Sequence, residues 1–269
     1  MDLDLHQKHA LVTGSTSGIG HAIAKRLLEE GAIVTVNGRS EKTVQDAVAR
    51  LESSAGDWAG RIHGVAADLG TAEGARHLAE AAAKIAPVEI LVNNAGMFEP
   101  VPFEKITDEK WQAIFNVNVL SGIRMCRALL PVMKERGWGR VIFISSESGL
   151  NIPTEMIHYG MSKSAQLSIS RGLAKEMSGT GVTVNCVLPG PTWTEGVETF
   201  VEQMAEGSDK SKQQLRDDFV PENRPGSLVG RFGEPAEVAN MVAFIASPLA
   251  AMTTGAALRV EGGIVDSIV

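Results

Sequence analysis

The sequence predicts a doubly wound α/β fold: one parallel sheet of seven strands with helices between them, in a single domain over residues 1–269. Short apolar runs that end at glycine, asparagine or aspartate alternate with longer segments whose apolar residues recur at helical spacing. Hydrophobic residues make up 44% of the chain and aromatic residues only 5%, which suits an interior of small aliphatic side chains between sheet and helices. No linker, internal repeat or low-complexity tract divides the 269 residues, a length that suits one well-buried domain.

The expected strands are short and mostly apolar, as in parallel strands that are buried on both faces. They cover residues 9–13, 33–36, 62–66, 90–92, 140–144, 182–188 and 257–260. The expected helices carry apolar residues three and four positions apart. They cover about residues 22–28, 42–51, 71–85, 108–136, 158–177 and 235–246. This alternation brings the carboxyl ends of the strands to one edge, where open α/β sheets bind ligands.

A glycine-rich turn joins the first strand to the first helix. Residues 14–20 read Gly-Ser-Thr-Ser-Gly-Ile-Gly, a different spacing from the commoner Gly-x-Gly-x-x-Gly of dinucleotide sites. Glycines let the backbone approach a pyrophosphate, and a helix N-terminus offers unpaired N–H groups and positive potential. Because a strand and a helix flank the turn in the right order, we interpret it as a phosphate site and not as an ordinary loop.

The end of the second strand bears on the choice of dinucleotide. A site selective for NAD places an Asp or Glu there to bind the ribose 2′-hydroxyl, but this chain has Gly38 and Arg39. The planar guanidinium of Arg39 suits a 2′-phosphate, and no carboxylate repels that group. NADP(H) is therefore the expected cofactor. Use of NAD(H) stays open, because Ser17 adds no second positive charge and Arg39 also suits a solvated helix start.

Residues 146–163 contain the candidate catalytic groups. Tyr159 and Lys163 are four apart, so on a helix they share a face, and the ammonium would lower the pKa of the phenol. Ser146 follows the apolar run at 140–144 and would lie at the carboxyl edge of the sheet. Upstream, Asn118 stands amid apolar residues of the long helix, so its amide either faces water or serves a polar site. A Tyr-x-x-x-Lys pair alone is also typical of helix surfaces, so its meaning depends on the phosphate site before it.

Charge and composition argue against several other classes of protein. The formal net charge of −7 disfavours nucleic acid and acidic membrane surfaces as partners, since both bind basic proteins. Cys126 and Cys186 lie in apolar segments, so we expect buried reduced thiols and neither a disulfide nor a metal site. No apolar run approaches about 20 residues, and the N-terminus lacks the basic start and apolar core of a signal peptide. We therefore expect a cytoplasmic protein.

The stretch at about 195–230 predicts a helical lid. One helix face is apolar and is formed by Val197, Phe200, Val201 and Met204. Leu215 and Phe219 indicate a second short helix, and the opposite faces are acidic: Glu195, Glu198, Glu202, Glu206, Asp209, Asp217 and Asp218. Such a lid would close over a substrate and exclude water, although a surface excursion or an oligomer contact would have the same pattern. Trp193, Phe98 and Met97 are expected in the pocket wall, which favours a partly apolar substrate.

Taken together, the motifs resemble the short-chain dehydrogenase/reductase family, in its short single-domain branch with a Rossmann fold. The resemblance covers essentially the whole chain. It rests on Thr13-Gly14-x-x-x-Gly18-Ile19-Gly20, Asp68, Asn93-Asn94-Ala95-Gly96, Asn118, Ser146, Tyr159-x-x-x-Lys163 and Pro189-Gly190-x-x-x-Thr194, in this order.

The resemblance implies an oxidoreductase that moves a hydride between a nicotinamide and a carbonyl or secondary alcohol. Tyr159 would be the general acid or base, and Ser146 would hydrogen-bond the substrate oxygen. Lys163 would lower the pKa of Tyr159 and hold the nicotinamide ribose, and Asn118 would fix a water on a proton path to solvent. The residues implied at the cofactor are Gly14, Ser15, Ser17, Gly18, Ile19, Gly20, Arg39, Asp68, Leu69, Asn94, Ala95, Gly96, Tyr159, Lys163, Pro189, Gly190, Thr192 and Thr194.

The resemblance also implies a homotetramer, or a homodimer, paired through the helices at 108–136 and 158–177. Two other functions stay open. A 3-oxoacyl-[acyl-carrier-protein] reductase would need basic residues for its acidic partner. Family members that bind the acyl-carrier protein have arginines at two positions where this chain has Gly137 and Thr180. The basic residues Lys134, Arg136 and Lys175 are near these positions in the sequence. A dinucleotide-binding redox sensor would not need the intact catalytic residues.

Overall fold

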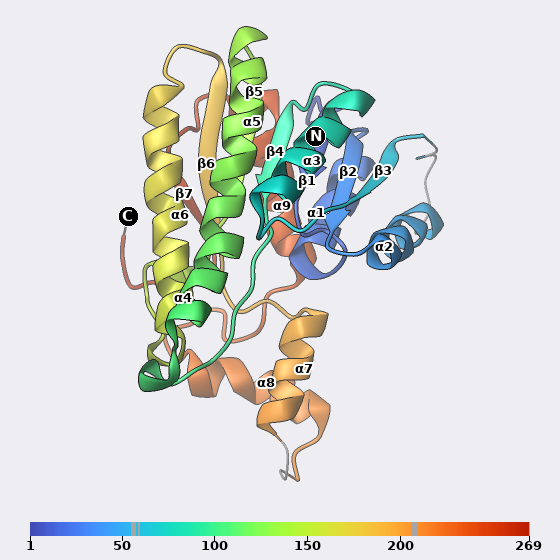
Figure 1. Cartoon of the computed structure of the whole chain (residues 1–269). Coiled ribbons are helices and arrows are strands. Elements are labelled where there is room, and N and C mark those ends of the chain that lie inside the picture. The colour runs from blue at the N-terminus through green and yellow to red at the C-terminus, as the bar shows by residue number, and fades with distance from the viewer. Residues whose placement is uncertain (55–57, 59, 206–208, 269) are drawn as a thin grey trace.

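A parallel sheet forms the centre of the molecule (Figure 1). The structure is a computed structural model that describes residues 1–54, 58, 60–205 and 209–268. In these residues seven strands are ordered β3-β2-β1-β4-β5-β6-β7. The strands are β1 (His9–Val12), β2 (Ile33–Gly38), β3 (Ile62–Ala66), β4 (Ile90–Asn93), β5 (Gly139–Ile144), β6 (Val182–Pro189) and β7 (Ala257–Val260). All neighbouring pairs are parallel, so the predicted fold class is confirmed.

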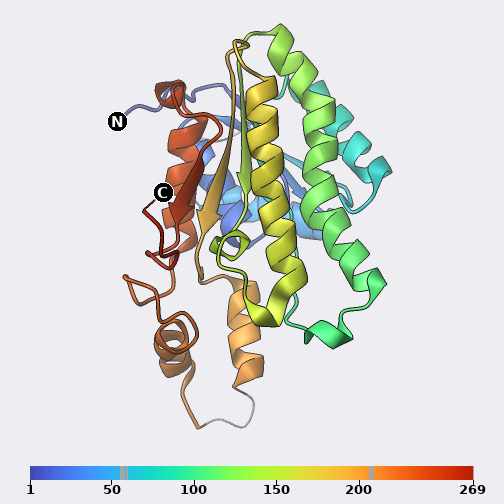
Figure 2. The ribbon, with the colours of Figure 1, turned by 90° about the vertical axis from the view of Figure 1, so that its left-hand side faces the viewer.

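Helices cover both faces of the sheet, as the edge-on view in Figure 2 shows. Against one face pack α1 (Gly18–Glu29), α2 (Glu41–Ser53) and α9 (Pro235–Ala246). Against the other pack α3 (Ala72–Ile85), α5 (Ser121–Glu135) and α6 (Ile157–Glu176). The strands between them are buried on both sides, which is why their sequences are almost continuously apolar.

The strand order reverses between β1 and β4. From β1 the chain continues outward to β2 and β3, and it then returns to place β4 on the other side of β1. The loops after β1 and β4 therefore separate at the carboxyl edge and leave a crevice there, the position at which doubly wound sheets bind ligands. The glycine turn follows β1, and residues 94–96 follow β4.

The long helix expected at 108–136 contains a break in its hydrogen-bond pattern. It consists of α4 (Asp108–Phe115), a π-helical turn at Asn116–Leu120, and α5. A π turn inserts an extra residue into the helix, and such turns are frequent at functional sites. Here the turn contains Asn118, which is buried. Sequence periodicity did not reveal the π turn.

One of the described helical stretches, Asp108–Glu135, is long and apolar enough to cross a membrane by length and composition alone. Half of its most apolar window (50%) is buried inside the fold. Met125 and Leu129 of this stretch contact the core against β4 and β5. The buried half of its apolar residues is thus accounted for by packing within the molecule.

Two further helices lie beyond the carboxyl edge of the sheet, at the bottom of Figure 1. They are α7 (Glu195–Met204) and α8 (Lys212–Asn223). Val201, Val220 and Phe232 are buried between them, and the rings of Phe219 and Phe232 stack with centroids 5.2 Å apart. This small cluster holds the two helices together. Of the predicted lid residues, the Met204 side chain and Glu206 lie outside the described part of the chain.

Candidate active site

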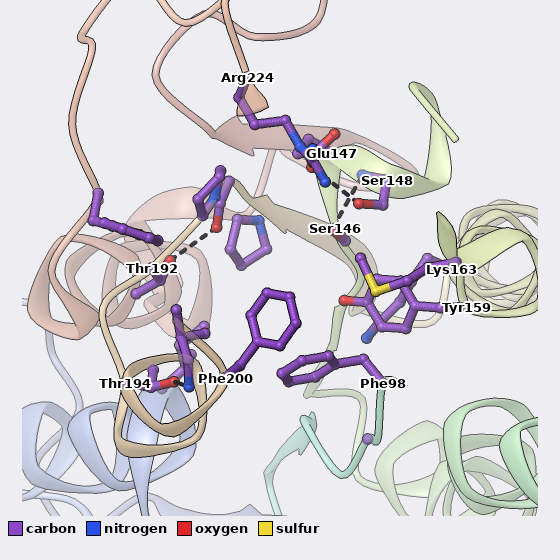
Figure 3. Close-up of a pocket in the computed structure, with 18 of the residues that line it drawn as sticks. Phe98, Ser146, Glu147, Ser148, Tyr159, Lys163, Thr192, Thr194, Phe200 and Arg224 are labelled. Carbon is purple, nitrogen blue, oxygen red and sulfur yellow. Dashed lines mark hydrogen bonds and ion pairs between the residues drawn. The ribbon is translucent and has the colours of Figure 1, made fainter. Parts of the chain in front are cut away.

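A cavity of about 810 Å³ opens between the carboxyl edge of the sheet and helices α7 and α8 (Figure 3). Its lining comes from the first turn of α1, the segments after β4, β5 and β6, the start of α6, and both outer helices. Of the residues that the sequence singled out for catalysis or cofactor binding, this cavity brings together Ile19, Asn94, Gly96, Ser146, Tyr159, Lys163, Pro189, Gly190, Thr192 and Thr194.

Tyr159 and Ser146 point to the same part of the cavity. Tyr159 lies in the first turn of α6, and Ser146 lies two residues beyond β5. The Ser146 hydroxyl hydrogen-bonds the Tyr159 phenol and also accepts from the Ser148 N–H at 3.1 Å. Phe98 packs edge-on against the tyrosine ring, with centroids 6.3 Å apart. A carbonyl oxygen placed here would meet two hydroxyl donors.

Lys163 lies one turn after Tyr159 and is almost completely buried. Its Nζ donates to the Ile144 carbonyl oxygen at 2.8 Å and lies 5.5 Å from the centroid of the tyrosine ring. Burial lowers the pKa of Lys163 to about 8, because the low-dielectric surroundings disfavour the ammonium.

The expected lowering of the Tyr159 pKa is wrong for the chain without cofactor. Burial is the main cause that raises the pKa of Tyr159; the hydrogen bond with Ser146 opposes it and the negative charge of Glu147 adds to it, and together they bring the pKa to about 12. Lys163 does not reverse this shift because its ammonium is directed to the Ile144 carbonyl. In this state the phenol holds its proton firmly.

Asn118 lies behind the cavity wall. Its amide donates to the Met97 carbonyl and to the Ser162 hydroxyl, both at 2.9 Å, and accepts from the Met97 N–H at 2.8 Å. Its own carbonyl oxygen accepts from Gln166 Nε2 at 2.6 Å. Of the two alternatives, the side chain therefore does not face water but joins buried polar groups, and it ties the loop after β4 to α6.

The glycine turn is shaped for close approach. Gly14 has a φ of +59°, and a Cβ at this position would lie 2.9 Å from the Ala95 Cα. The Asn94 amide donates to the carbonyl oxygens of Thr13 and Gly14, both at 2.9 Å. These hydrogen bonds join the ends of β1 and β4, and the small residues there leave the backbone open to the crevice. The turn has the shape that a pyrophosphate needs.

An anion already lies at the N-terminus of α1. The Gly18 N–H donates to a carboxylate oxygen of Glu195 at 3.1 Å, although the two residues are 177 positions apart. The carboxylate has the charge and the oxygen acceptors of a phosphate group, and it occupies the position where the helix dipole favours negative charge. The residues present therefore fit the phosphates of a dinucleotide.

Comparison with known proteins identifies the family. The model described as short chain dehydrogenase matches residues 8–205. The oxidoreductase YvaG of Bacillus subtilis (strain 168) is 47% identical over 268 residues, and YvrD of the same strain is 45% identical over 268 residues; each match covers 100% of both chains. The protein belongs to the short-chain dehydrogenase/reductase family.

A solved structure agrees with this assignment. L-sorbose reductase from Gluconobacter frateurii, complexed with NADPH and L-sorbose, matches with a TM-score of 0.93 and 30% identity, over 100% of each chain. The resemblance stated from the motifs is confirmed: the protein is a short-chain dehydrogenase/reductase, an oxidoreductase of CH–OH and C=O groups that binds an NAD(P) dinucleotide.

Three of the residues expected at the cofactor, Arg39, Asp68 and Leu69, are not among those that line the cavity. Arg39 is exposed just after β2, and Asp68, also exposed, follows β3 and accepts from the Gly70 N–H at 3.0 Å. Leu69 is buried beside it. Ser15 is buried, its hydroxyl donates to the Val12 carbonyl at 2.6 Å and its N–H donates to the Asn37 carbonyl at 2.8 Å, so both of its donors are used within the fold.

The remaining residues that were expected at the cofactor border the cavity or the turn. The Gly190 N–H donates to the Val260 carbonyl at 3.0 Å, which holds the segment after β6 beside β7. The Thr194 hydroxyl caps α7 by accepting from the Val197 N–H at 3.3 Å. Ser17 is the exposed N-cap of α1, and the buried Gly20 lies in its first turn.

Three residues at the site were not identified from sequence. Arg50 of α2 donates to the Thr16 carbonyl of the glycine turn. Glu147 and Arg224 line the cavity and form an ion pair, with Arg224 Nε 3.6 Å from Glu147 Oε1. Helical periodicity could have placed Arg50 on α2. The contact of Arg50 with Thr16 and the ion pair of Glu147 with Arg224 join residues that are distant in the chain, and no local sequence pattern predicts such contacts.

One predicted wall residue lies elsewhere. Met97 and Phe98 line the cavity as expected, but Trp193 packs behind it against Phe232, with ring centroids 5.0 Å apart, and under the guanidinium of Arg216. Trp193 therefore supports the outer helices rather than the cavity surface.

Both cysteines, Cys126 and Cys186, are buried free thiols, as predicted. In the described ranges of the chain, no group of three or more His, Cys, Asp and Glu side chains is placed to hold a metal ion.

Proposed function

We propose that this protein is an NADP(H)-dependent reductase of ketone groups, or dehydrogenase of the corresponding secondary alcohols, with Tyr159 as the general acid or base. The observation that carries the proposal is the meeting of Tyr159 and Ser146 at one point of a cavity that continues to the glycine turn. When bound, the nicotinamide supplies or accepts the hydride.

The two hydroxyl groups would have different roles at the substrate oxygen. In the reduction direction, Tyr159 donates its proton to the carbonyl oxygen as negative charge develops there. Ser146 donates a second hydrogen bond to the same oxygen and stabilises that charge. The Tyr159 pKa of about 12 without cofactor means that the phenol is protonated before the reaction, as an acid must be.

Lys163 and Asn118 support the acid. Lys163 is the residue that would hold the nicotinamide ribose. To reach the ribose, its ammonium would have to break one hydrogen bond, the one that it donates to the Ile144 carbonyl. Its positive charge near the phenol would then favour phenolate and help Tyr159 release its proton. Asn118 would help to return that proton from solvent through an ordered water.

Helices α7 and α8 act as a lid in this proposal. Phe200 and Phe219 of these helices line the cavity opposite Tyr159, and their rings lie edge-on at 6.2 Å. Closing this apolar surface over a substrate would exclude water and strengthen the hydrogen bonds to the substrate oxygen. Pro189, Gly190, Thr192 and Thr194 would contact the carboxamide end of the cofactor.

The preference for NADP(H) rests on positive charge beside the glycine turn. Arg39 is exposed where the 2′-phosphate would lie, and Arg50 adds a second guanidinium at Thr16. A Cβ on Gly38 would lie 2.5 Å from the Thr16 side chain, so the backbone at Gly38 lies close to the glycine turn. The NADPH in the L-sorbose reductase structure supports the same preference.

An acyl-carrier-protein reductase is less well supported. The carrier is an acidic partner, and the outer helices beside the cavity are themselves acidic: Glu195, Glu198, Glu202, Asp217, Asp218 and Glu222. Lys210 and Lys212 of this region form ion pairs with these carboxylates and do not give a basic surface. A redox sensor is disfavoured by the complete set of Ser146, Tyr159 and Lys163.

The function is tested with the change Tyr159→Phe. We expect NADPH-dependent turnover of a ketone panel to fall by about 10²–10⁴, because the ring still packs but the proton donor is gone. The dissociation constant for NADPH should stay within a few-fold of the wild type. Activity near the wild-type level in the variant would remove Tyr159 from its role. Tight NADPH binding by the wild type without turnover of any carbonyl would favour the sensor.

The cofactor preference is tested with one shared substrate. A charge-assisted contact to phosphate predicts that kcat/KM is roughly ten- to hundredfold higher with NADPH than with NADH. The change Arg39→Leu should lower this ratio toward one, because it removes the cation that would meet the 2′-phosphate. A carboxylate at position 38 is not introduced, since a Cβ there would lie 2.5 Å from the Thr16 side chain. Equal use of NADH and NADPH by the native protein would contradict the preference.

A further inference from the structure

The aromatic residues of this chain are concentrated at the cavity. The sequence contains 8 Phe, 4 Trp and only 1 Tyr among its 269 residues. Several of these rings come from segments that are far apart in the chain and form one connected series of ring contacts: Tyr159, Phe98, Phe200, Phe219, Phe232 and Trp193. A chain with so few aromatic residues thus places many of them next to the proposed general acid.

One part of this series is the core of the lid. Phe219 stacks on Phe232, Trp193 packs against Phe232, and Phe232 is only 3% exposed. Packing between α7 and α8 therefore accounts for these rings. It does not account for Phe98, which is 41% exposed and belongs to the segment after β4. A large apolar side chain that is exposed inside a cavity is typical of a ligand contact.

Phe98 and Phe200 lie beside the proposed acid. Both rings line the cavity, and Figure 3 shows the Tyr159 hydroxyl pointing toward them. The Phe98 ring centroid is 6.3 Å from that of Tyr159 and 6.3 Å from that of Phe200, with interplanar angles of 69° and 89°. A group on the substrate carbonyl carbon is adjacent to the oxygen that Tyr159 would protonate. Such a group therefore lies within reach of both rings.

The two rings are held in place from outside the cavity. The Met97 N–H donates to the Asn118 side chain at 2.8 Å, and the Met97 carbonyl accepts from the same side chain at 2.9 Å, which fixes the backbone next to Phe98. Phe200 is supported by Phe219, whose ring lies edge-on at 6.2 Å. A ligand thus meets rings whose positions are largely set before it binds, and this lowers the entropic cost of binding.

The charged side chains on the lid side of the cavity form ion pairs. Arg224 Nε lies 3.6 Å from a Glu147 oxygen, and Arg224 Nη2 lies 3.3 Å from a Glu155 oxygen. Glu222 pairs with Lys210 at 3.0 Å. A charged group of a substrate would have to compete with these pairs. The described lining therefore favours an uncharged substrate that binds through its apolar part.

Aromatic rings attract one another in particular orientations. A ring has negative potential on its faces and positive potential on its edge, so two rings prefer edge-to-face or offset contacts and gain more than the burial of their area provides. Because Phe98 and Phe200 are nearly perpendicular, they offer both a face and an edge to a third ring. A saturated ring of the same size has no such charge pattern.

We propose that Phe98 and Phe200 form a subsite for an aromatic ring attached to the substrate carbonyl, so that the substrate class is uncharged aryl ketones and the corresponding secondary alcohols. This inference rests on the proposed function and names its substrate class. In the reduction, the carbonyl carbon gains a hydride from the reduced nicotinamide and the carbonyl oxygen gains the proton of Tyr159. The aryl ketone becomes a secondary alcohol, and its ring is unchanged.

The test compares acetophenone with cyclohexyl methyl ketone, which has a saturated ring of the same carbon number, with NADPH as the reductant. The measured quantity is the ratio of kcat/KM for acetophenone to kcat/KM for cyclohexyl methyl ketone. The two carbonyls differ in intrinsic reactivity, so the ratio of each variant is compared with that of the wild type. Phe98→Leu and Phe200→Leu keep an apolar side chain but remove the ring, and each should lower the ratio about three- to tenfold. Phe98→Tyr keeps the ring and should keep the ratio within about twofold.

Phe103→Leu is the matched control, because Phe103 is 61% exposed and is not among the residues that line the cavity. It should leave the ratio unchanged. An equal fall in Phe103→Leu, or an unchanged ratio in either Phe98→Leu or Phe200→Leu, would overturn the proposal and leave the proposed reductase intact. Reduction of other ketones by the wild type without reduction of acetophenone would overturn it as well. If the wild type reduces no carbonyl at all, the proposed function itself fails. Thermal melting confirms that each variant is folded before its ratio is interpreted.

Discussion

At the scale of single residues, burial shifts the pKa values of the two central ionisable groups in opposite directions. Tyr159 and Lys163 are both buried, and burial disfavours the charged form of each: the pKa of the phenol rises to about 12 and that of the ammonium falls to about 8. Desolvation outweighs their mutual attraction because the Lys163 ammonium is bound to a carbonyl instead of facing the phenol.

This shift predicts a dependence of stability on pH. An unfolded lysine titrates at about 10.4, whereas folded Lys163 titrates at about 8. Between these values the unfolded chain binds more protons, so the free energy of unfolding rises with pH, by at most about 1.4 kcal/mol per pH unit. The wild type without cofactor should therefore gain stability relative to Lys163→Met between about pH 8 and 9.5.

Urea unfolding of both proteins at several pH values measures this difference. The buried thiols titrate in both proteins, so their contribution cancels in the comparison. Tyr159 is also present in both proteins, so the contribution of its raised pKa cancels in the same way. A difference that is constant from pH 8 to 9.5 would contradict the lowered pKa of Lys163.

At the scale of elements, the N-terminus of α7 contacts the N-terminus of α1. The Glu195 carboxylate accepts from the Gly18 N–H, in the region where the glycine turn would receive a pyrophosphate. A carboxylate and a pyrophosphate repel each other and compete for the same positive end of the helix dipole. Binding of the dinucleotide is therefore expected to displace Glu195 and to move the start of the lid.

The change Glu195→Gln tests this coupling. Removing one negative charge at a helix N-terminus is worth about 0.3–1 kcal/mol to a competing anion, so the dissociation constant for NADPH should fall about two- to fivefold. Glu198→Gln is the control: its carboxylate pairs with Lys212 and not with the glycine turn, and its effect should be smaller. Calorimetric titration gives both values. Weaker NADPH binding by Glu195→Gln would show that the carboxylate supports the cofactor site.

At the scale of the whole molecule, the outer face of α5 and α6 is the expected assembly surface. A groove of about 510 Å³ runs between these helices and is lined by Ile123, Leu130, Ile169 and Leu173. Met125 and Leu129, two apolar residues of the helix expected at 108–136, are buried in the core of their own chain and are not available to a partner.

We expect a homotetramer, because burying this groove removes apolar surface from water. Sedimentation velocity at micromolar concentration measures the mass. A species of four chains agrees with the prediction, and a dimer would limit the assembly to one two-fold interface. A monomer at this concentration would contradict it.

The order and type of the main elements could be predicted from the sequence because they depend on local patterns. The seven strand positions agree with the described structure to within one or two residues, since buried parallel strands are short apolar runs that end at turn residues. The glycine turn, Ser146 and the pair Tyr159 and Lys163 could be located for the same reason. Each occupies a defined place relative to a strand end or a helix turn.

The tertiary structure alone decided what depends on contacts between distant segments. Glu147 looks like an ordinary loop residue until Arg224 and the cavity lie beside it, and Glu195 looks like part of an acidic helix face until α7 meets the glycine turn. The π turn at Asn118 and the raised pKa of Tyr159 likewise follow from packing and burial. The sequence by itself determined the family, the fold and the positions of the proposed catalytic groups, because motifs at strand ends and on helix faces encode them. The lining of the cavity and the protonation of Tyr159 and Lys163 required the structure, because they depend on neighbouring residues that no local sequence pattern specifies.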